Sequence, residues 1–467
     1  MNRIRIPALL LTLPLLLTAC GSQSAPIDTT SADTSSAPAE TTETFDVPEA
    51  LDFGGRSFTI LTIDEGVLYT YFEDVEAENG DVMNDAIYRR NRKVEEYLNI
   101  KFEVETVAGS TALLPRAQQD IMSSDSTFDM ISTHIIRNNA TLVTEGYVMD
   151  LAELEHLNFT KSWWNSSFAD TMSIKGKTFF ASGDMIVPNA RVIVFNKQMM
   201  EDNSLPDIYE TVRSGSWTLD TMGSYTKDMV RDLDGNNVLD ENDQYAFSDL
   251  SNTGLGTSFV HASGQLIVEK EGTDSFRLTL QDEKMDTLLN KLYDYLYRDG
   301  NTKITNTEFG NGNVLFGSQV LLKLQVLRDS KTEFGVIPFP KYDESQDKYY
   351  SSVWNGLVCV PITAKDMDCV GAVMESLAYY SQDTLVPAYY EKLLGGKFAQ
   401  DDDSVEMLDI IFDGLVYDIG FCFDNFIGCY SAIGTLLNEG NIALSSYYAA
   451  NGAVYETHYQ ELFDSVE

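Results

Sequence analysis

The sequence has few of the residues on which most enzyme and metal motifs depend. Its 467 residues include four histidines and five cysteines, and none of them shows the spacing of a zinc site. It also lacks a phosphate-binding Gly-x-x-x-x-Gly-Lys loop, a complete dinucleotide fingerprint and a Gly-x-Ser-x-Gly elbow. These absences argue against the common nucleotide-, zinc- and serine-dependent enzymes. Carboxylates are so abundant that a glycoside hydrolase stays open as an alternative.

Basic side chains are scarce relative to acidic ones. The chain has 32 Lys and Arg against 72 Asp and Glu, which gives a formal net charge of −40. Nucleic acids and anionic lipid headgroups both attract basic surfaces, so neither is expected as a partner. The charge suits a highly soluble exported protein, which we expect to be a monomer.

Long apolar runs are missing except at the N-terminus. Residues 6–17 are almost entirely apolar and follow Arg3 and Arg5, which is the order of a signal peptide. The sequence Leu17-Thr18-Ala19-Cys20 resembles the lipobox of bacterial lipoproteins, in which the cysteine is lipidated and becomes the mature N-terminus. We therefore predict a signal peptide over residues 1–19 and a lipid anchor on Cys20, with the protein at the extracellular face of the cell membrane. An ordinary secretory signal with a chance cysteine is the alternative.

The anchor is followed by a segment without the composition of a folded domain. Residues 21–44 contain no aromatic residue and are rich in Ser, Thr, Ala, Pro and acidic residues. Such a segment cannot bury enough apolar surface to offset its ordering entropy. We predict a flexible tether over residues 20–46. The remaining body is too long for one simple core, so two or three domains are expected.

Strands and helices alternate along this body. A 3.6-residue apolar period predicts helices over 85–98, with Asn84 as the cap, and over 281–298. Continuous or alternating apolar residues predict strands over 57–63, 100–104, 128–133, 191–195 and 334–339. This order favours a parallel sheet covered by helices on both faces. The C-terminal third is expected to be mainly helical.

The order of these segments resembles that of family 1 extracellular solute-binding proteins of ABC importers, the group that includes maltose-binding protein. The stretches that carry the likeness are Gly80–Ile100, Gly176–Gly183, Val192–Lys197, Gly215–Asp220 and Phe334–Pro340. The resemblance implies an α/β, two-lobed, periplasmic-binding-protein type II-like fold with the ligand cleft between the lobes. It further implies one lobe from 47–190 plus about 348–395, and a second from 191–347 plus about 396–467.

The resemblance also implies a function without covalent chemistry. The chain is expected to capture a solute by hinge closure and to deliver it to the subunits of an ABC permease. A carbohydrate, in particular an oligosaccharide, is the leading ligand, because this family mostly handles sugars and the chain is rich in aromatic residues. A peptide- or amino-acid-binding lipoprotein, or one that feeds a sensor, is kept as an alternative beside the glycoside hydrolase.

Several side chains are candidates for the cleft. Sugars present C–H faces that stack on aromatic rings, and ligands in open α/β sheets lie at the carboxyl ends of strands. Tryptophan more often packs in a core, and the flanking polar residues could equally form ion pairs or caps. The candidate ligand-binding residues are Thr133, His134, Trp163, Trp164, Asp184, Arg191, Phe316 and Trp354. Trp217, which precedes an expected helix, is interpreted as structural.

One stretch has the spacing of a calcium loop. Calcium takes several oxygen ligands, and an EF-hand-like loop supplies them from positions 1, 3, 5, 7, 9 and 12. In this chain those positions are Asp232, Asp234, Asn236, Val238 through its carbonyl, Asp240 and Asp243. Asn237 replaces the usual glycine and Asp243 the usual glutamate. Leu239 is expected to pack inward. The sequence therefore favours a structural Ca²⁺ site over a merely hydrophilic turn.

The cysteines after the predicted anchor have no clear joint role. Cys359 lies in an apolar run and is predicted to be a buried free thiol. Cys422 and Cys429 could form a disulfide, and their state is left open.

Overall fold

The computed structural model describes residues 43–64, 72, 75–137, 139–249, 254–298, 304–305, 309–327, 330, 332–394, 402–424 and 428–466. Residues 1–45 and 46–467 form separate compact units, and every described helix and strand belongs to the second. The predicted signal peptide, Cys20 and nearly all of the predicted tether lie outside the described residues. No helix among the described residues combines the length and the hydropathy needed to cross a membrane.

The first sheet combines strands from the two ends of the body. Its order is β12-β3-β1-β2; β1 runs parallel to β2 and β3, and β12 runs antiparallel to β3. The strands are β1 (Arg56–Asp64), β2 (Ile100–Ala108), β3 (Met130–His134) and β12 (Gly356–Cys359). The three strands predicted here, over 57–63, 100–104 and 128–133, are confirmed. Every residue of β3 is buried, which explains its continuous run of apolar and small residues.

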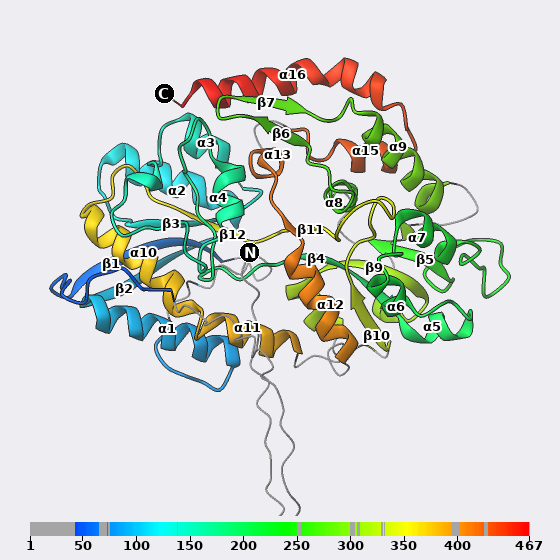
Figure 1. Ribbon diagram of the computed structural model, residues 1–467, viewed down its shortest axis with the longest axis horizontal. Helices are drawn as coiled ribbons and strands as arrows, with labels where there is room; N and C mark the ends of the chain where they lie inside the picture. Colours follow the sequence, from blue (N-terminus) through cyan, green and yellow to red (C-terminus); the bar gives the residue numbers. More distant parts are fainter. Residues whose placement is uncertain are drawn as a thin grey trace, which may run out of the picture. The chain divides into compact units, whose positions relative to one another are not determined.

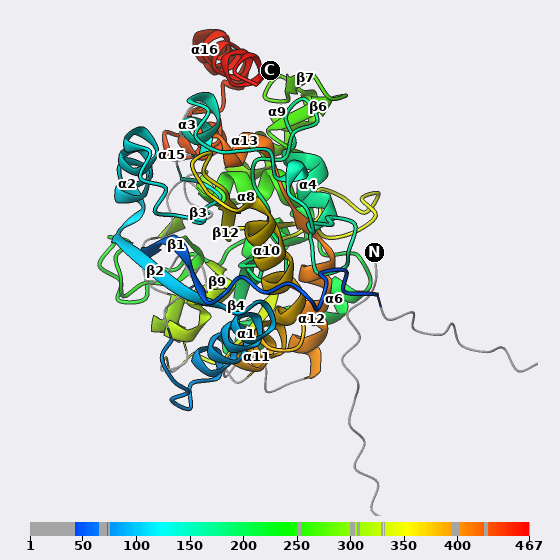
Figure 2. The ribbon, with the colours of Figure 1, turned by 90° about the vertical axis from the view of Figure 1, so that its left-hand side faces the viewer.

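Helices cover both faces of this sheet. The helix α2 (Ser110–Ser123) lies on one face, and α1 (Val82–Leu98) lies on the other with α11 (Leu385–Leu394), as Figure 2 shows. The helix α10 (Met367–Ser381) also packs against α1. The chain therefore returns to the first sheet with β12.

The predicted cap of α1 is wrong by one turn. Asp81, not Asn84, caps the helix, and its carboxylate accepts hydrogen bonds from the backbone N–H groups of Met83 and Asn84. The Asn84 amide donates to the carbonyl of Ala77 instead. An aspartate three residues upstream is an equally good cap by type, so the apolar period alone could not separate the two.

The second sheet has the order β10-β4-β9-β5-β8. The strand β4 is antiparallel to β10 and β9, whereas β5 is parallel to β9 and β8. The strands are β4 (Arg191–Asn196), β5 (Tyr245–Asp249), β8 (Ile304–Thr305), β9 (Val314–Val320) and β10 (Phe334–Ile337). The strands predicted at 191–195 and 334–339 are therefore confirmed, whereas β5 and β9 were not predicted. Figure 1 shows this sheet beside the first.

Short helices accompany the second sheet. They are α5 (Lys197–Asp202), α6 (Ile208–Arg213), α7 (Leu219–Thr226), α8 (Gly254–Ala262) and α9 (Glu283–Leu292). The helix expected over 281–298 is shorter than predicted, because a π-helical turn (Tyr293–Tyr297) follows α9. Trp217 is fully buried and its indole N–H donates to the carbonyl of Pro338 at 3.0 Å, which agrees with its structural interpretation.

The C-terminal third is mainly helical, as predicted. Apart from the two-residue β13 (Leu415–Val416), the described residues after α11 form helices and their connections. The helices are α12 (Asp402–Asp413), α13 (Ile419–Cys422), α15 (Ala432–Asn438) and α16 (Leu444–Asp464). Earlier in the chain lie the short helices α3 (Asn139–Thr144) and α4 (Ser166–Met172). The strands β6 (Val268–Glu271) and β7 (Ser275–Leu278) form a hairpin, which α16 contacts.

Segments that connect the two sheets lie side by side. Ala190, just before β4, forms a β-bridge with Val353, and the backbone N–H of Trp354 donates to the carbonyl of Asn189 at 2.9 Å. Next to them, β11 (Ser351–Ser352) pairs in parallel with β13. The two sheets are thus joined by neighbouring extended segments, here called the crossing segments (183–190, 351–355 and 415–418).

The four cysteines among the described residues are free thiols. Cys359, Cys369, Cys422 and Cys429 are buried and unpaired with one another, so the prediction for Cys359 is confirmed and no Cys422–Cys429 disulfide forms.

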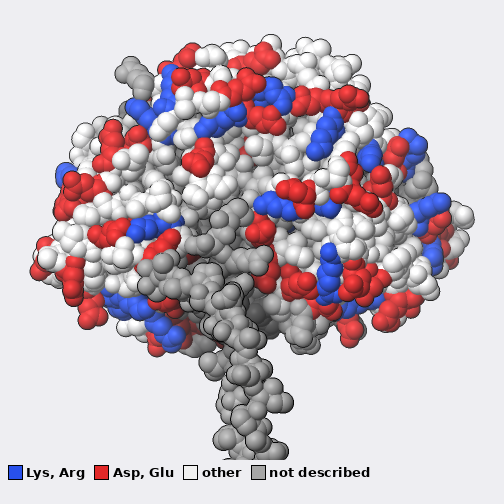
Figure 3. Space-filling model, in the orientation of Figure 1, with Lys and Arg blue, Asp and Glu red and all other residues white. Residues whose placement is uncertain are grey.

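On the surface, acidic and basic side chains are interspersed over the face seen in Figure 3.

Candidate functional site

Polar side chains of the second sheet meet at one edge. Asp249 ends β5, Ser318 lies opposite it on β9, and Arg191 begins the antiparallel β4. The Arg191 guanidinium donates to the Asp249 carboxylate and to the Ser318 hydroxyl, both at 2.8 Å. Both charged side chains are almost fully buried, with 3% and 2% exposed. Arg191 thus forms an ion pair within its own sheet, which agrees with the ion-pair alternative for the flanking polar residues.

Trp354 reaches this edge from the crossing segment that leads into the first sheet. Its indole ring lies 5.4 Å from the guanidinium carbon of Arg191 and 5.2 Å from the ring of Phe421. The ring of Tyr430 is 6.2 Å away and stacks on Phe421 at 4.6 Å. Trp354 is half-buried, and its ring lies beside a cation that is held in place by Asp249 and Ser318.

The start of α8 fits closely against this group. A Cβ atom on Gly254 would lie 2.3 Å from a guanidinium nitrogen of Arg191 and 2.8 Å from the Trp354 ring. Only glycine allows so close an approach of backbone to side chains. The helix therefore begins directly at the Arg191–Trp354 contact.

His134 lies at the carboxyl end of β3, as predicted, and opposite Gly356 of β12, which brings it to the Trp354 segment. Burial and the nearby charge of Arg137 lower the pKa of His134 to about 3, against the opposing effect of the Trp354 backbone, so its ring is neutral. Thr133 points elsewhere, since its hydroxyl donates to the carbonyl of Arg137 and to the side chain of Asn139.

Three buried polar atoms at this place have no hydrogen-bond partner among the described residues. They are the His134 Nε2 atom, the Trp354 indole N–H and the Tyr430 hydroxyl. Each unpaired buried polar group costs about 1–3 kcal/mol, and native structures contain few of them. Their concentration marks a place where a polar ligand would find ready partners. We call His134, Arg191, Trp354 and Tyr430 the Trp354 site.

Trp163 and Trp164 have a different environment from that predicted. Both are closed to solvent, with 1% and 4% exposed. Their indole N–H groups donate to the two oxygens of the Glu375 carboxylate, at 2.8 and 2.6 Å. Neither indole presents a ring face to solvent in this structure, so their role here is to tie the 163–164 turn to α10.

The other predicted cleft residues are also separate from the Trp354 site. Phe316 on β9 is fully buried and packs against Trp217 at 5.6 Å, so the structure gives it a core role. Asp184 is half-buried, and burial raises its pKa to about 7 against a hydrogen bond with Gln382. Asp184 therefore lies on a crossing segment but beside α10.

The 232–243 loop brings carboxylates together. Oxygens of Asp232, Asp234 and Asp243 lie within 4.8 Å of one another. Asn237 takes a left-handed conformation, with φ of 63°, and its backbone N–H donates to Asp232, so asparagine fills the place of the usual glycine. The Asp232 pKa is lowered by backbone hydrogen bonds, that of Asn237 first, which keeps the carboxylate ionised. Leu239 packs against the core, as predicted.

Asp240 lies in the same loop but outside the group of three carboxylates. Its backbone N–H donates to Asp243 Oδ2 at 2.8 Å, and its own Oδ1 accepts from Asn242. The Val238 side chain is 62% exposed, and the side-chain oxygen of Asn236 accepts from the backbone N–H of Val238. The cluster of carboxylates fits a hard divalent cation.

A Ser-His-Asp chain exists but is sealed. His261 contacts the Ser352 hydroxyl at 2.9 Å and the Asp418 carboxylate at 3.1 Å. All three residues are at most 1% exposed, so no substrate reaches the serine. The chain instead links α8 to two crossing segments.

Sequence reasoning missed part of the Trp354 site. Tyr430 is one of 24 tyrosines and lies in no recognisable motif. Asp249 ends a strand that was not predicted, so the rule that placed His134 could not be applied to it. Residues 250–253 and 425–427, which neighbour Asp249 and Tyr430 in the chain, lie outside the described residues.

No family model and no curated protein matches this chain, but solved structures do. A cyclic α-maltosyl-1,6-maltose binding protein from Arthrobacter globiformis superposes with a TM-score of 0.62 at 14% identity, covering 87% of this chain and 100% of that one. A galacto-N-biose/lacto-N-biose I-binding protein of a Bifidobacterium longum ABC transporter gives 0.56 at 12% identity, covering 87% and 98%. An ABC substrate-binding protein from Listeria monocytogenes in complex with cycloalternan gives 0.55 at 13% identity, covering 86% and 99%. The fold implied by the resemblance is thereby confirmed.

Proposed function

We propose that this chain is the extracytoplasmic solute-binding protein of an ABC importer, and that it binds a carbohydrate without transforming it. Two lobes, each built on one sheet, close on the solute, and the closed form docks on the permease. The lobes proposed are residues 47–190 plus about 348–395, and 191–347 plus about 396–467. The pairing of β12 with β3, and of β4 with β9 and β10, supports this division.

The observation that carries the proposal is the Trp354 site itself. Unpaired polar atoms of His134, Trp354 and Tyr430 gather where the carboxyl end of β3 meets the crossing segment that bears Trp354. Hydroxyl groups donate and accept, so a sugar can pair with a neutral imidazole, an indole N–H and a phenol at once. The half-buried indole offers a face for the C–H groups of a sugar ring.

The structural relatives support the choice of carbohydrate. By their names, these three proteins bind a cyclic maltosyl-maltose, galacto-N-biose or lacto-N-biose, and cycloalternan. Each is a saccharide of two or more units. We therefore infer an oligosaccharide as the ligand class of this chain.

A thermal-shift screen of the full chain tests the proposal. The panel contains maltose, maltotetraose, lacto-N-biose, a dipeptide and free amino acids. A ligand at 100 times its dissociation constant adds about 2.7 kcal/mol to the unfolding free energy, so an oligosaccharide is expected to raise the melting temperature. Chromatography of the recovered sugar is expected to show it uncleaved.

Other outcomes of the screen point to the alternatives. A shift with peptides or amino acids alone would replace the carbohydrate by that ligand class. Hydrolysis of the sugar would replace the binding protein by a glycoside hydrolase. A binding protein that feeds a sensor would give the same shift, and co-purification with permease subunits separates the two.

We also propose that Cys20 carries the lipid anchor that holds the protein at the extracellular face of the cell membrane. The support is the order of basic residues, apolar run and lipobox-like Leu17-Thr18-Ala19-Cys20. Metabolic labelling with a palmitate analogue is expected to tag the wild-type chain, and a Cys20→Ala chain is expected to stay untagged.

A bound Ca²⁺ in the 232–243 loop is the last part of the proposal. The convergence of Asp232, Asp234 and Asp243 supports it, and Asn236, the Val238 carbonyl and Asp240 would complete the ligand set. The ion would fix the loop that leads into β5, and thereby the strand that ends at Asp249.

A further inference from the structure

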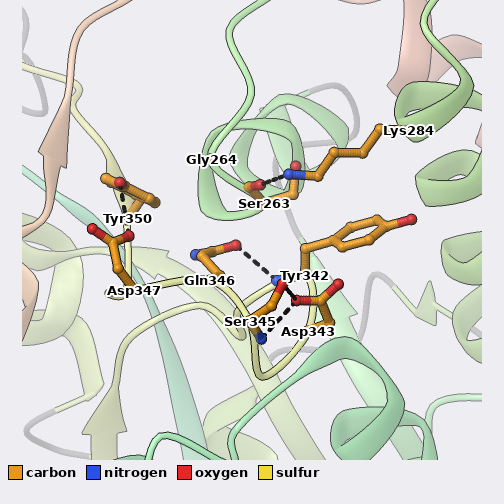
Figure 4. A pocket seen from close by; sticks show the side chains of 9 residues that line it. All are labelled: Ser263, Gly264, Lys284, Tyr342, Asp343, Ser345, Gln346, Asp347 and Tyr350. Atoms are coloured by element: carbon orange, nitrogen blue, oxygen red, sulfur yellow. Dashed lines mark hydrogen bonds between the residues drawn. The ribbon is translucent and has the colours of Figure 1, made fainter.

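A second polar pocket lies away from the Trp354 site. It has a volume of about 510 Å³, which is within the range of small-molecule sites. Its lining residues come from the end of α8, the start of α9 and the loop before β11 (Figure 4); they are Ser263, Gly264, Lys284, Tyr342, Asp343, Ser345, Gln346, Asp347 and Tyr350.

The loop that forms most of this pocket is held in place by its own hydrogen bonds. The Gln346 side chain accepts from the backbone N–H of Tyr342 and donates to the carbonyls of Ala262 and Lys348. Asp343 accepts from both the backbone and the hydroxyl of Ser345 through Oδ1. The pocket is therefore preformed, which lowers the cost of binding.

Groups of both charges remain open to a ligand. Asp343 and Asp347 use Oδ1 for the hydrogen bonds found among the described residues, and the second oxygen of each carboxylate accepts none of them. Lys284 donates to the carbonyl of Ser263 and keeps two further N–H bonds. The Tyr342 and Tyr350 rings stand on opposite sides of Gln346 (Figure 4).

This chemistry selects the class of ligand. A simple cation would meet Lys284, whose ammonium lies 4.8 Å from the Tyr342 ring centre, and a simple anion would meet Asp343 and Asp347. A neutral molecule with many hydroxyl groups can donate to the carboxylates and accept from the ammonium. Its C–H groups can pack on the two tyrosine rings.

We propose that this pocket is a second binding site for a neutral polyhydroxylated ligand of one or two sugar rings, separate from the Trp354 site. The pocket's own lining carries the proposal, which stands whether or not the Trp354 site takes a sugar. Tyr350 directly precedes β11, and Ser263 directly follows the end of α8, whose first residue lies against Trp354. An occupant therefore contacts two elements that lead to the Trp354 site.

Saturation-transfer NMR on the full chain tests the second site. The probes are D-glucose, D-galactose, D-mannose and maltose, with putrescine and inorganic phosphate as charged comparisons; the charged probes are read by titration of the pocket's resonances. A Trp354→Ala background weakens the first site, so that the second contributes a larger share of the signal. At least one neutral sugar is expected to receive saturation in that background, and adding Tyr350→Ala is expected to reduce the signal at least fivefold.

A matched tyrosine provides the control. Tyr88 on α1 is half-buried and lies 5.6 Å from the guanidinium of Arg92, as Tyr350 lies 5.3 Å from the ammonium of Lys348. Tyr88→Ala is expected to leave the signal unchanged. Asp347→Asn, which preserves size, is expected to reduce it too and serves if Tyr350→Ala misfolds.

Three results would overturn the second site. They are saturation of no neutral sugar in the Trp354→Ala background, a signal that Tyr350→Ala and Asp347→Asn leave intact, and binding of putrescine or phosphate alone. None of these bears on the thermal-shift screen of the Trp354 site, so the two proposals fail separately.

Discussion

At the scale of single residues, Arg191 and Trp354 have different roles in the candidate site. The Arg191 guanidinium donates hydrogen bonds to Asp249 and Ser318. These bonds fix the position of the charged group in the site. The indole is only half-buried and its N–H has no partner among the described residues. Trp354 is therefore the residue whose removal should affect a ligand most directly.

We expect Trp354→Ala to weaken oligosaccharide binding by roughly 30-fold, which corresponds to the loss of about 2 kcal/mol typical of an aromatic anchor. The fold should survive, because the side chain is partly exposed. Isothermal titration with the ligand found in the thermal-shift screen measures the loss. Trp217→Ala is the contrasting variant: it empties a fully buried position and should cost about 3–5 kcal/mol of folding free energy. Equal affinity in Trp354→Ala and wild type would move Trp354 to a packing role.

Asp184 makes stability depend on pH. Burial raises its pKa to about 7 in the folded chain, whereas an unfolded chain titrates near the ordinary aspartate value of about 3.9. Between these values the folded state binds more protons, so the contribution of this residue to stability falls as pH rises.

Asp184→Asn should therefore raise the unfolding free energy at pH 8 by an amount on the order of 1–4 kcal/mol and change it little at pH 4. Denaturant melts at the two pH values measure the effect. The exposed Asp228→Asn serves as control and should show no such difference. A gain that is the same at both pH values would refute the assignment.

Residue positions were predicted best where the strand pattern decides them. His134 was expected at the carboxyl end of a strand, and it is the last residue of β3; its contact with a ligand stays a prediction. Trp163, Trp164 and Phe316 could not be separated from core residues by type, because the same aromatic surface serves packing and stacking. Their partners, Glu375 and Trp217, are distant in sequence and come close only in the fold.

At the scale of elements, the 232–243 loop allows the sharpest test. Calcium at 100 times its dissociation constant should add about 2.7 kcal/mol to the unfolding free energy, so chelation should lower the melting temperature. Asp232→Ala should melt at the same temperature with and without chelator. Asp286→Ala, which removes an exposed carboxylate outside the loop, should keep the chelator effect. Identical wild-type melts in calcium and in chelator would rule out the ion.

Strands with a simple apolar pattern were predictable, whereas β5 and β9 were not. The strand β9 contains Gly317, which reads as a turn residue, but a Cβ there would lie 3.0 Å from both Phe309 and Val194. The strand β5 is short and mixes Ser and Asp with apolar residues, although all five residues are buried. In both strands the packing against neighbours decides the structure, and local pattern does not reveal it.

At the scale of the whole molecule, the crossing segments determine which motions are available. The neighbouring segments around Ala190, Val353 and β13 join the two sheets, and the buried His261 ties α8 to two of them. A rotation about these segments changes the distance between the sheets without breaking either one.

Ligand binding should therefore reduce the radius of gyration of the chain. Small-angle X-ray scattering with and without the ligand measures this change, and closure requires that the ligand bind the closed form more tightly than the open one. Trp354→Ala at the same ligand concentration should keep the larger radius. An unchanged radius at saturation would mean that the solute binds without closure.

The pairing of β12 with β3 has a consequence for biogenesis. The first sheet starts at Arg56 but is completed only by Gly356–Cys359, so a chain that is still being synthesised leaves one edge of β3 unpaired until its last third has arrived. Open strand edges template aggregation, and contacts so distant in sequence form slowly. Prematurely terminated chains would thus expose this edge to other chains, and the Trp354 site is completed late, when the segment bearing Trp354 closes the sheet.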